Sequence, residues 1–273
     1  DHLDLHLSIR RQRQMCIRDS LDSALDLLRA NSSLKAEKKA SRVAADGAVK
    51  VAETSSYVSL VEINSETDFA AKDSQFKDFT SSVADHLTST RVDSITSLNE
   101  ALDGQRQTLI QSIGENIQLR RLSTLEIPEG GSIGSYIHSD GRLAALVSLN
   151  VDNKELAKDL AMHVSATSPS CLNSDDIDPA LLERERAIYL AQAEESGKDQ
   201  AIMEKMVDGK VKRFLSEVTL VSQAFVKNPD QSIQQLIDEN NASIIDFVRF
   251  KVGEGIEVEV KDFATEVAEQ LKK

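Results

Sequence analysis

The sequence predicts an α+β fold with a small N-terminal helical module, a core of two related α+β halves, and an inserted antiparallel helical hairpin. Three observations lead to this prediction. A strand followed by a helical pattern occurs in each half of the chain, at 57–88, where the strand is rich in β-branched residues, and again at 143–167. Similar segments then follow in the same order in both halves. Two further helical patterns interrupt the second half at 176–216.

The N-terminal module is predicted from one short helix. Asp19 or Ser20 is a suitable cap, and the apolar residues that follow repeat at i, i+3, i+4 and i+7: Leu21, Ala24, Leu25 and Leu28. Residues 1–18 show no helical face that continues into this pattern. A basic, polar connector, Lys35 to Arg42, then leads to Asp46-Gly47.

The first half of the core begins with a strand, Tyr57-Val-Ser-Leu-Val-Glu-Ile-Asn64, which ends in a polar stretch that reaches Asp68. A helix is expected next over 73–88, capped by Asp73 and with Phe76, Phe79 and Val83 on one side. The remaining elements expected in this half are a helix over about 105–114 and a strand pair at 117–126 and 132–138.

The second half repeats this order. The strand 143–149 is followed by a helix over 153–167, as the strand 57–64 is followed by its own helix. The segment 107–116 leads into Ile117-Gln-Leu-Arg-Arg-Leu, and the similar segment 232–240 leads into Ile244-Ile-Asp-Phe-Val-Arg-Phe. Shared order over several elements predicts two related subdomains.

The insertion at 176–216 is predicted to form a projecting pair of helices. Asp178-Pro179 is a favourable helix start. The first helix is expected to end near Ser196-Gly197-Lys198, and the second has apolar residues on one side: Ile202, Met203, Met206, Val207, Phe214 and Leu215. Such an arm contacts a partner or another copy of itself; the alternative is a helical pair that packs only on its own core.

Composition restricts the function. The 273 residues carry a net charge of −13 and a pI near 4.9, which argues against nucleic acid as the main partner. No apolar run is long enough for a membrane span, and none near the start is typical of a signal peptide. The two cysteines, Cys16 and Cys171, form no metal-ligand or disulfide pattern, so a reducing cytoplasm is the expected compartment.

Catalytic motifs are scarce. None of the five histidines pairs with another at a metal-ligand spacing, and His163 is expected to be packed rather than catalytic. Gly253-Glu-Gly255 lacks the third glycine of a dinucleotide-binding motif and is better interpreted as a turn. An enzyme would require His138, Asp140 and Cys171 to converge in one pocket with shifted pKa values. The sequence therefore predicts no enzymatic activity and no cofactor or metal.

One segment, Thr67-Asp-Phe-Ala-Ala-Lys-Asp73, has the residues of an interaction site between a strand and a helix. Asp68 is a candidate helix cap. Phe69 is either a core residue that staples the helix or a rigid aromatic side chain at a loop tip, the kind of anchor that carries interface energy.

With these residues in view, the chain resembles the bacterial elongation factor Ts family over about residues 20–270. Six stretches carry the resemblance: Lys38-Lys-Ala-Ser-Arg-Val-Ala-Ala-Asp-Gly47, Val61-Glu-Ile-Asn-Ser-Glu-Thr-Asp-Phe-Ala-Ala-Lys-Asp73, Ile113-Gly-Glu-Asn-Ile117, Gly134-Ser-Tyr-Ile-His138, Ala161-Met-His-Val164, and Phe247-Val-Arg-Phe-Lys-Val-Gly-Glu-Gly-Ile-Glu257. Residues 1–20 depart from the family pattern, so the family's contacts through its N-terminal module are not transferred to this chain.

The resemblance implies a ubiquitin-associated-like N-terminal module, two core subdomains, a coiled-coil arm and a C-terminal helix. The corresponding expected boundaries are 1–46 for the module and connector, 47–142 for the first subdomain, 143–260 for the second with its insertion at 176–216, and 261–273 for the C-terminal helix.

The resemblance also implies a partner and a site. The partner is elongation factor Tu, in its GDP-bound and nucleotide-free forms, with a homodimer inside a 2:2 complex as an open alternative. Thr67, Asp68, Phe69 and Ala70 match the segment with which the family displaces the partner's magnesium and phosphate-holding elements. Further expected partner contacts are Tyr136, His138 and Val226. The alternative function is a scaffold that joins partners through its arm without nucleotide exchange.

Overall fold

The computed structural model describes residues 39–194 and 199–257. Its strands are β1 Asp46–Glu53, β2 Tyr57–Ser65, β3 Gln118–Glu126, β4 Ser132–Ile137, β5 Leu143–Leu149, β6 Ala224–Phe225, β7 Asn228–Ser232 and β8 Ile244–Lys251. Its helices are α2 Asp68–Lys72, α3 Ser74–Ser89, α4 Ile95–Ile113, α5 Lys154–Thr167, α6 Pro179–Glu194, α7 Gln200–Val218 and α8 Ile233–Glu239, with short 3₁₀ turns at Ser174–Asp176 and Leu220–Ser222. The fold is thus mixed α and β, as predicted.

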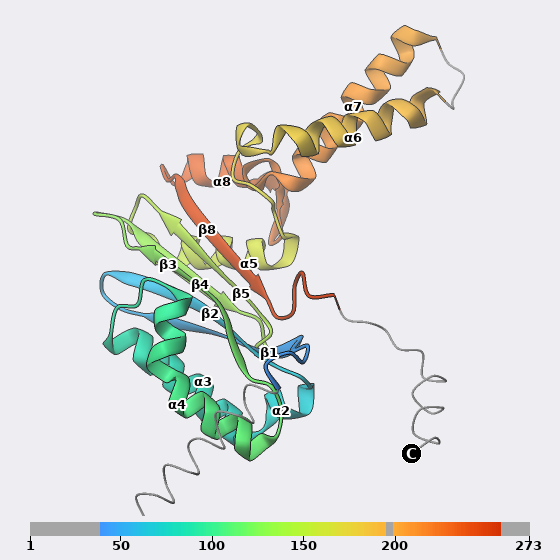
Figure 1. The fold of residues 1–273 in the computed structure, drawn as a ribbon. Helices are drawn as coiled ribbons and strands as arrows, with labels where there is room; N and C mark the ends of the chain where they lie inside the picture. Colours follow the sequence, from blue (N-terminus) through green and yellow to red (C-terminus); the bar gives the residue numbers. More distant parts are fainter. Residues whose placement is uncertain (1–38, 195–198, 258–273) are drawn as a thin grey trace, which may run out of the picture.

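Two antiparallel three-stranded sheets form the core, and they have the same connectivity. In the first sheet β2 lies between β1 and β3, and in the second β5 lies between β4 and β8. Each sheet begins with a hairpin, passes through helices, and ends with a strand that returns beside the central one. Figure 1 shows the two sheets between α3 and α4 on one side and α5 on the other.

The central strands are buried on both faces. Every residue of β2 is buried, because its odd-numbered side chains such as Val61 and Ile63 pack on α3 and α4, while Val58 and Leu60 face the second sheet. Similarly, β5 packs on α5 with one face and on the first sheet with the other. A core layer between the two sheets therefore joins the halves into one body.

The structure corrects several details of the sequence prediction. β1 was not predicted, because its sequence DGAVKVAE contains few residues of high β-propensity. β3 and β4 were expected to pair with each other, but β3 pairs with β2 and β4 with β5. The boundary proposed at 142/143 would consequently separate β4 from its own sheet. The helix expected at 105–114 begins earlier, at Ile95, where the Ser94 side chain caps it.

The insertion contains two helices, α6 and α7, that lie side by side and extend away from the sheets (Figure 1). The two helices contact each other between Arg186 and Asp208 and between Gln192 and Lys210. Asp178 caps the first helix by accepting a hydrogen bond from the Ala180 N–H, as its Asp-Pro start predicts.

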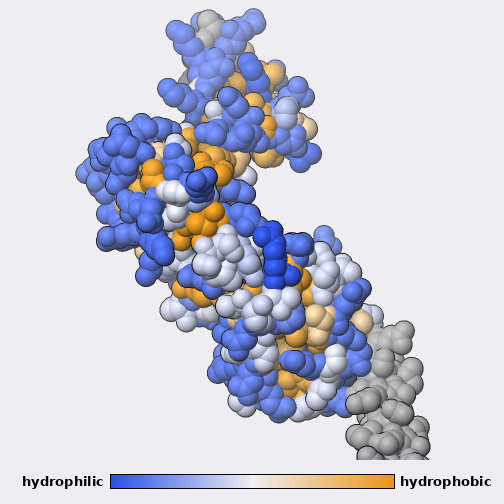
Figure 2. Space-filling model, turned by 90° about the vertical axis from the view of Figure 1, so that its left-hand side faces the viewer, coloured by the Kyte–Doolittle hydropathy of each residue, from blue (hydrophilic) through white to orange (hydrophobic). Residues whose placement is uncertain are grey.

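Several predictions fall outside the described residues: the helix at 21–28, the hairpin tip at 196–198 and the C-terminal helix at 261–273. Within the described part, no helix is long and apolar enough to cross a membrane. Figure 2 shows a mostly hydrophilic face with apolar side chains exposed in small separate groups.

Candidate functional site

The segment after β2 turns into the short helix α2 and presents Phe69 to solvent. Thr67 caps this helix: its Oγ1 accepts a hydrogen bond from the Ala70 N–H at 3.3 Å. Asp68 is therefore the first residue of the helix and not its cap, which corrects the prediction. Phe69 is 79% exposed, whereas the next residue, Ala70, is buried. The alternative that Phe69 is a core residue is wrong.

Glu115, which lies just after the C-terminal end of α4, holds this loop by hydrogen bonds. One of its carboxylate oxygens accepts the backbone N–H of Thr67 at 3.0 Å, and the other accepts the Thr67 hydroxyl at 2.7 Å. In the opposite direction, the Glu66 carboxylate accepts the backbone N–H of Asn116 at 2.6 Å. The two segments thus clamp each other with charge-assisted hydrogen bonds, which are stronger than neutral ones.

The clamp depends on how α4 ends. Gly114 takes the left-handed conformation, with φ of 86°, and its carbonyl accepts the Lys39 ammonium at 2.6 Å. Asn116 is fully buried and donates to the Arg42 carbonyl at 2.8 Å. The segment 113–117 is therefore a junction between the connector, α4 and the loop that carries Phe69.

Asp68 forms an ion pair with Lys72 on the exposed side of α2, with 2.6 Å between Oδ2 and Nζ. The hydrogen bond and charge of Lys72 lower the pKa of Asp68, so this carboxylate is ionised at neutral pH. Asp73, as predicted, caps the following helix α3 by accepting the Gln75 N–H at 2.8 Å.

A cleft of about 310 Å³ lies between this loop and the turn that joins β4 to β5. Asp68 and Lys72 line one side, and Ile137 and Asp140 line the other. The cleft brings part of the predicted Thr67–Ala70 site close to the second predicted contact segment. Ile137, 44% exposed between Tyr136 and His138, was not predicted as a site residue.

Tyr136 and His138 line a separate cavity of about 460 Å³ together with Met162 and Arg249. Tyr136 is only partly exposed because it packs against the core beside α5. His138 is exposed and its Nδ1 lies 3.0 Å from Asp140. A backbone hydrogen bond from Arg142 and the contact with His138 lower the pKa of Asp140.

Val226 lies at the turn between β6 and β7 and is 45% exposed. Its backbone N–H donates to Nδ1 of the fully buried His163 at 3.3 Å. Nε2 of His163 must then carry the proton and donate to Gln223 Oε1, at 2.9 Å. Burial lowers the pKa of His163, so it is neutral and packed, as the sequence predicted.

The three residues of the enzyme alternative, His138, Asp140 and Cys171, do not line one cavity together. His138 and Asp140 are in contact, but Cys171 is buried against Thr219 and lines neither of the two cavities described above. Over residues 39–194 and 199–257, no three His, Cys, Asp or Glu side chains are grouped so that they could hold a metal ion.

Sequence reasoning missed the two glutamates that support Phe69. Glu66 and Glu115 lie inside stretches that carry the family resemblance, and that was the only signal that could have found them. Their contacts join positions far apart in the chain, which local patterns do not reveal.

The fold and the site define a class: an α+β protein of two packed sheets that presents an exposed aromatic side chain on a supported loop. A model of the family described as Elongation factor TS matches residues 66–254. Proteins named Elongation factor Ts from Hahella chejuensis and Teredinibacter turnerae are each 46% identical over 255 residues, which cover 92% of this chain and 88% and 87% of theirs. The relative from Saccharophagus degradans is 44% identical. The chain belongs to the elongation factor Ts family and is a translation elongation factor.

Proposed function

We propose that this chain binds elongation factor Tu, in its GDP-bound and nucleotide-free forms, and promotes release of GDP so that GTP can replace it. The observation that carries the proposal is Phe69, a large aromatic side chain with 79% exposure on a loop whose backbone is clamped by Glu115. An exposed aromatic residue on a rigid support loses little conformational entropy on binding, which is typical of an interface anchor.

In this proposal Phe69 inserts into the nucleotide-binding domain of the partner and distorts the elements that hold magnesium and phosphate. Asp68, kept ionised by Lys72, supplies a negative charge beside the inserted ring. Thr67 and Ala70 set the direction of the loop, because one caps α2 and the other is buried beneath it. The factor requires no chemistry of its own, since it acts only through binding energy.

Tyr136, His138 and Val226 are proposed as additional contacts of the same partner. Several contacts are needed because of linkage: a factor that weakens GDP binding by a given ratio is itself weakened by GDP by the same ratio. Each tenfold step in that ratio requires about 1.4 kcal/mol of differential contact energy. The coiled-coil nature of the α6–α7 arm, its contact with partner or self, and a cytoplasmic location belong to the same proposal.

The test is release of a fluorescent GDP from elongation factor Tu at saturating concentrations of this chain and of its Phe69→Ala variant. We expect the parent to accelerate release, and the variant to be slower by at least about tenfold, the loss typical of an interface hot spot. Ile245→Ala is the matched control, because Ile245 is 50% exposed and lies outside the site.

The other outcomes discriminate between hypotheses. Full activity in Phe69→Ala would move the exchange site elsewhere on the chain. If the parent binds elongation factor Tu without accelerating release, the scaffold function replaces exchange. Exposed apolar residues of the arm, Ile188 and Leu190, would then be the first contacts to change.

A further inference from the structure

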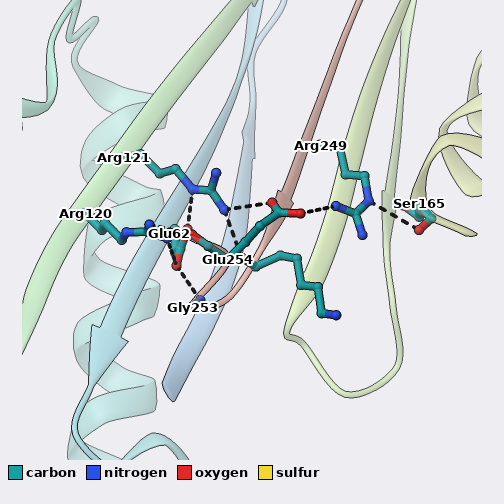
Figure 3. Close-up of polar contacts among 8 residues, drawn as sticks. Glu62, Arg120, Arg121, Ser165, Arg249, Gly253 and Glu254 are labelled. Carbon is teal, nitrogen blue, oxygen red and sulfur yellow. Dashed lines mark hydrogen bonds and ion pairs between the residues drawn. The ribbon is translucent and has the colours of Figure 1, made fainter. Parts of the chain in front are cut away.

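A buried carboxylate lies between the two sheets. Glu62 is on the face of β2 that meets the second sheet, next to Leu60, and is fully buried. It accepts hydrogen bonds from Arg120 at 3.0 and 3.2 Å, from Nε of Arg121, and from the backbone N–H of Gly253 at 2.9 Å (Figure 3). A buried charge is tolerated only with such partners, so their positions are tightly constrained.

A β-bulge explains how two consecutive arginines reach one carboxylate. Neighbouring residues of a regular strand point to opposite faces. In the pairing of β2 with β3, Glu62 is opposite Arg121 while Ile63 is opposite Leu119, which leaves Arg120 as the extra residue. A bulge of this kind re-aims side chains and recurs at functional places in sheets.

The same arginines reach across to the turn that follows β8. Arg120 donates to the carbonyl of Glu254 at 2.6 Å, and Arg121 donates to the carbonyl of Lys251 at 2.8 Å. Arg121 also stacks over the Phe250 ring, with 4.3 Å between its guanidinium carbon and the ring centroid. The first sheet thus holds the end of the last strand of the second sheet.

Glu254 extends the network to α5. Its carboxylate binds Arg249 at 2.8 Å and Arg121 at 3.4 Å, and Nε of Arg249 donates to the carbonyl of Ser165 at 3.4 Å. Although burial opposes ionisation, hydrogen bonds and charge attraction from Arg249 and Arg121 prevail and lower the pKa of Glu254. Glu62, Arg120, Arg121, Arg249 and Glu254 form what we call the inter-sheet cluster.

The turn after β8 requires glycine at position 253, where it passes close to the first half of the core. Gly253 has φ of 75°, and a side chain there would place its Cβ 2.3 Å from the carbonyl oxygen of Ala45, just before β1. Gly253-Glu-Gly255 is thus a turn, as the sequence predicted, and close contact with the first half explains the glycine at 253.

We propose that the inter-sheet cluster fixes the angle between the two sheets so that Phe69, from the first half, and Val226, from the second, contact one partner simultaneously. Glu254 is the positioning residue that links the two halves. The apolar layer between the sheets favours their association but has little directional preference. The pairs of arginines and carboxylates set the relative orientation of the sheets, since hydrogen bonds between these groups have a specific geometry. This inference rests on the proposed function.

The first test measures the orientation of the sheets directly. Spin labels are attached at Asp85→Cys on α3 and Lys158→Cys on α5, both exposed, in a full chain carrying Cys16→Ser; Cys171 is buried and is retained. Pulsed electron paramagnetic resonance then gives the distance distribution between the covering helices. We expect Glu254→Gln to broaden or shift it. Glu126→Gln, which removes an exposed ion pair with Arg91 inside the first half, should leave it unchanged.

The second test measures how strongly the two contacts cooperate. The concentration of factor that gives half-maximal GDP release is compared with and without Val226→Ala, in the parent and in the Glu254→Gln and Glu126→Gln chains. A rigid scaffold lets Val226 contribute fully once Phe69 is bound, whereas a loose one reduces its contribution. In the parent, Val226→Ala should raise the concentration that gives half-maximal release. We expect this rise to be about two- to fivefold smaller in the Glu254→Gln chain, within the usual range of coupling between linked residues. In the Glu126→Gln chain the rise should be the same as in the parent.

A cluster that only stabilises the fold would lower the melting temperature without changing the loss from Val226→Ala. An unchanged distance distribution in Glu254→Gln overturns the proposal. A broadened distribution also overturns it if Val226→Ala still raises the half-maximal concentration as much as in the parent. If Phe69→Ala and Val226→Ala have no effect in the parent, the proposed binding site is wrong and two-point positioning is wrong with it. The distance measurement would still show whether Glu254 orients the sheets, which separates the two failures.

Discussion

The two surface segments that carry Phe69 and Val226 are both exposed, but they are supported in different ways. The loop at Phe69 is held from outside the core by carboxylates, chiefly Glu115, whose contacts are partly open to solvent. The turn at Val226 is held from inside by one neutral, fully buried histidine, His163. The first support can be weakened without loss of the core, whereas the second is part of the core.

This difference predicts that replacing the supporting residue will separate binding from stability in the first half but not in the second. The second support is sensitive to mild acid, because burial lowers the pKa of His163 below that of an unfolded histidine.

Replacement of His163 should have the largest effect on stability. His163→Ala removes a buried ring that packs near Phe225, and it leaves the Val226 N–H and Oε1 of Gln223 without their partner. We expect the free energy of unfolding to fall by about 2–4 kcal/mol, from the cavity and the unpaired polar groups. Denaturant unfolding measures this directly.

The matched control is His138→Ala, since His138 is exposed and pairs with Asp140, which is also exposed. We expect its unfolding free energy to stay within about 0.5 kcal/mol of the parent. Equal losses in the two variants would show that burial of His163 is not what supports the Val226 turn.

Replacement of Glu115 should affect stability less and nucleotide exchange more. Glu115→Ala removes both hydrogen bonds to Thr67 but leaves Phe69 unchanged. We expect a loss of about 1–2 kcal/mol in the free energy of unfolding, toward the low end for charged hydrogen bonds because the contact is partly solvated. GDP release from elongation factor Tu should slow severalfold, because the loop no longer holds the ring in one direction.

Glu100→Ala, on the helix α4 that precedes Glu115, is the control for loss of a negative charge, since Glu100 is exposed. If Glu115→Ala promotes GDP release at the parent rate, Phe69 needs no fixed support. The difference between the two supports would then have no effect on exchange.

The sequence anticipated the parts of the fold that depend on local pattern. The strand β2 follows from its β-branched run, and the helices α3 and α5 follow from apolar residues at helical spacing. The cap at Asp73 and the packed state of His163 were also predicted correctly. These features depend on residues close together in the chain.

Non-local contacts were not predictable in this way. β3 pairs with β2 and not with β4, which is closer in the chain, and a local pattern does not encode such long-range pairing. The exposure of Phe69 is likewise decided by contacts between the segments around Glu66 and Asn116, which lie 50 positions apart. The residues that make the candidate site rigid are thus those that pattern analysis could not find.

Mild acid should weaken the Val226 turn and spare the Phe69 loop. Burial lowers the pKa of His163 in the folded chain, whereas an unfolded histidine titrates at about 6.5. As the pH falls below about 6.5, the unfolded state binds a proton before the folded state does, so stability decreases, by at most about 1.4 kcal/mol per pH unit. The support is complete above that pH. Asp68 stays ionised throughout, because its pKa is lowered.

Amide hydrogen exchange between pH 7 and 5.5 tests this, after correction for the intrinsic pH dependence of exchange. Protection of the Val226 N–H should decrease as His163 becomes protonated and can no longer accept its hydrogen bond. Protection of the Thr67 N–H, which is bound to a carboxylate, should remain constant. His163→Asn keeps a side-chain acceptor that does not titrate in this range, so its protection at Val226 should not depend on pH. Parallel loss at both amides would mean that acid opens the whole core, and the two supports would then not be independent.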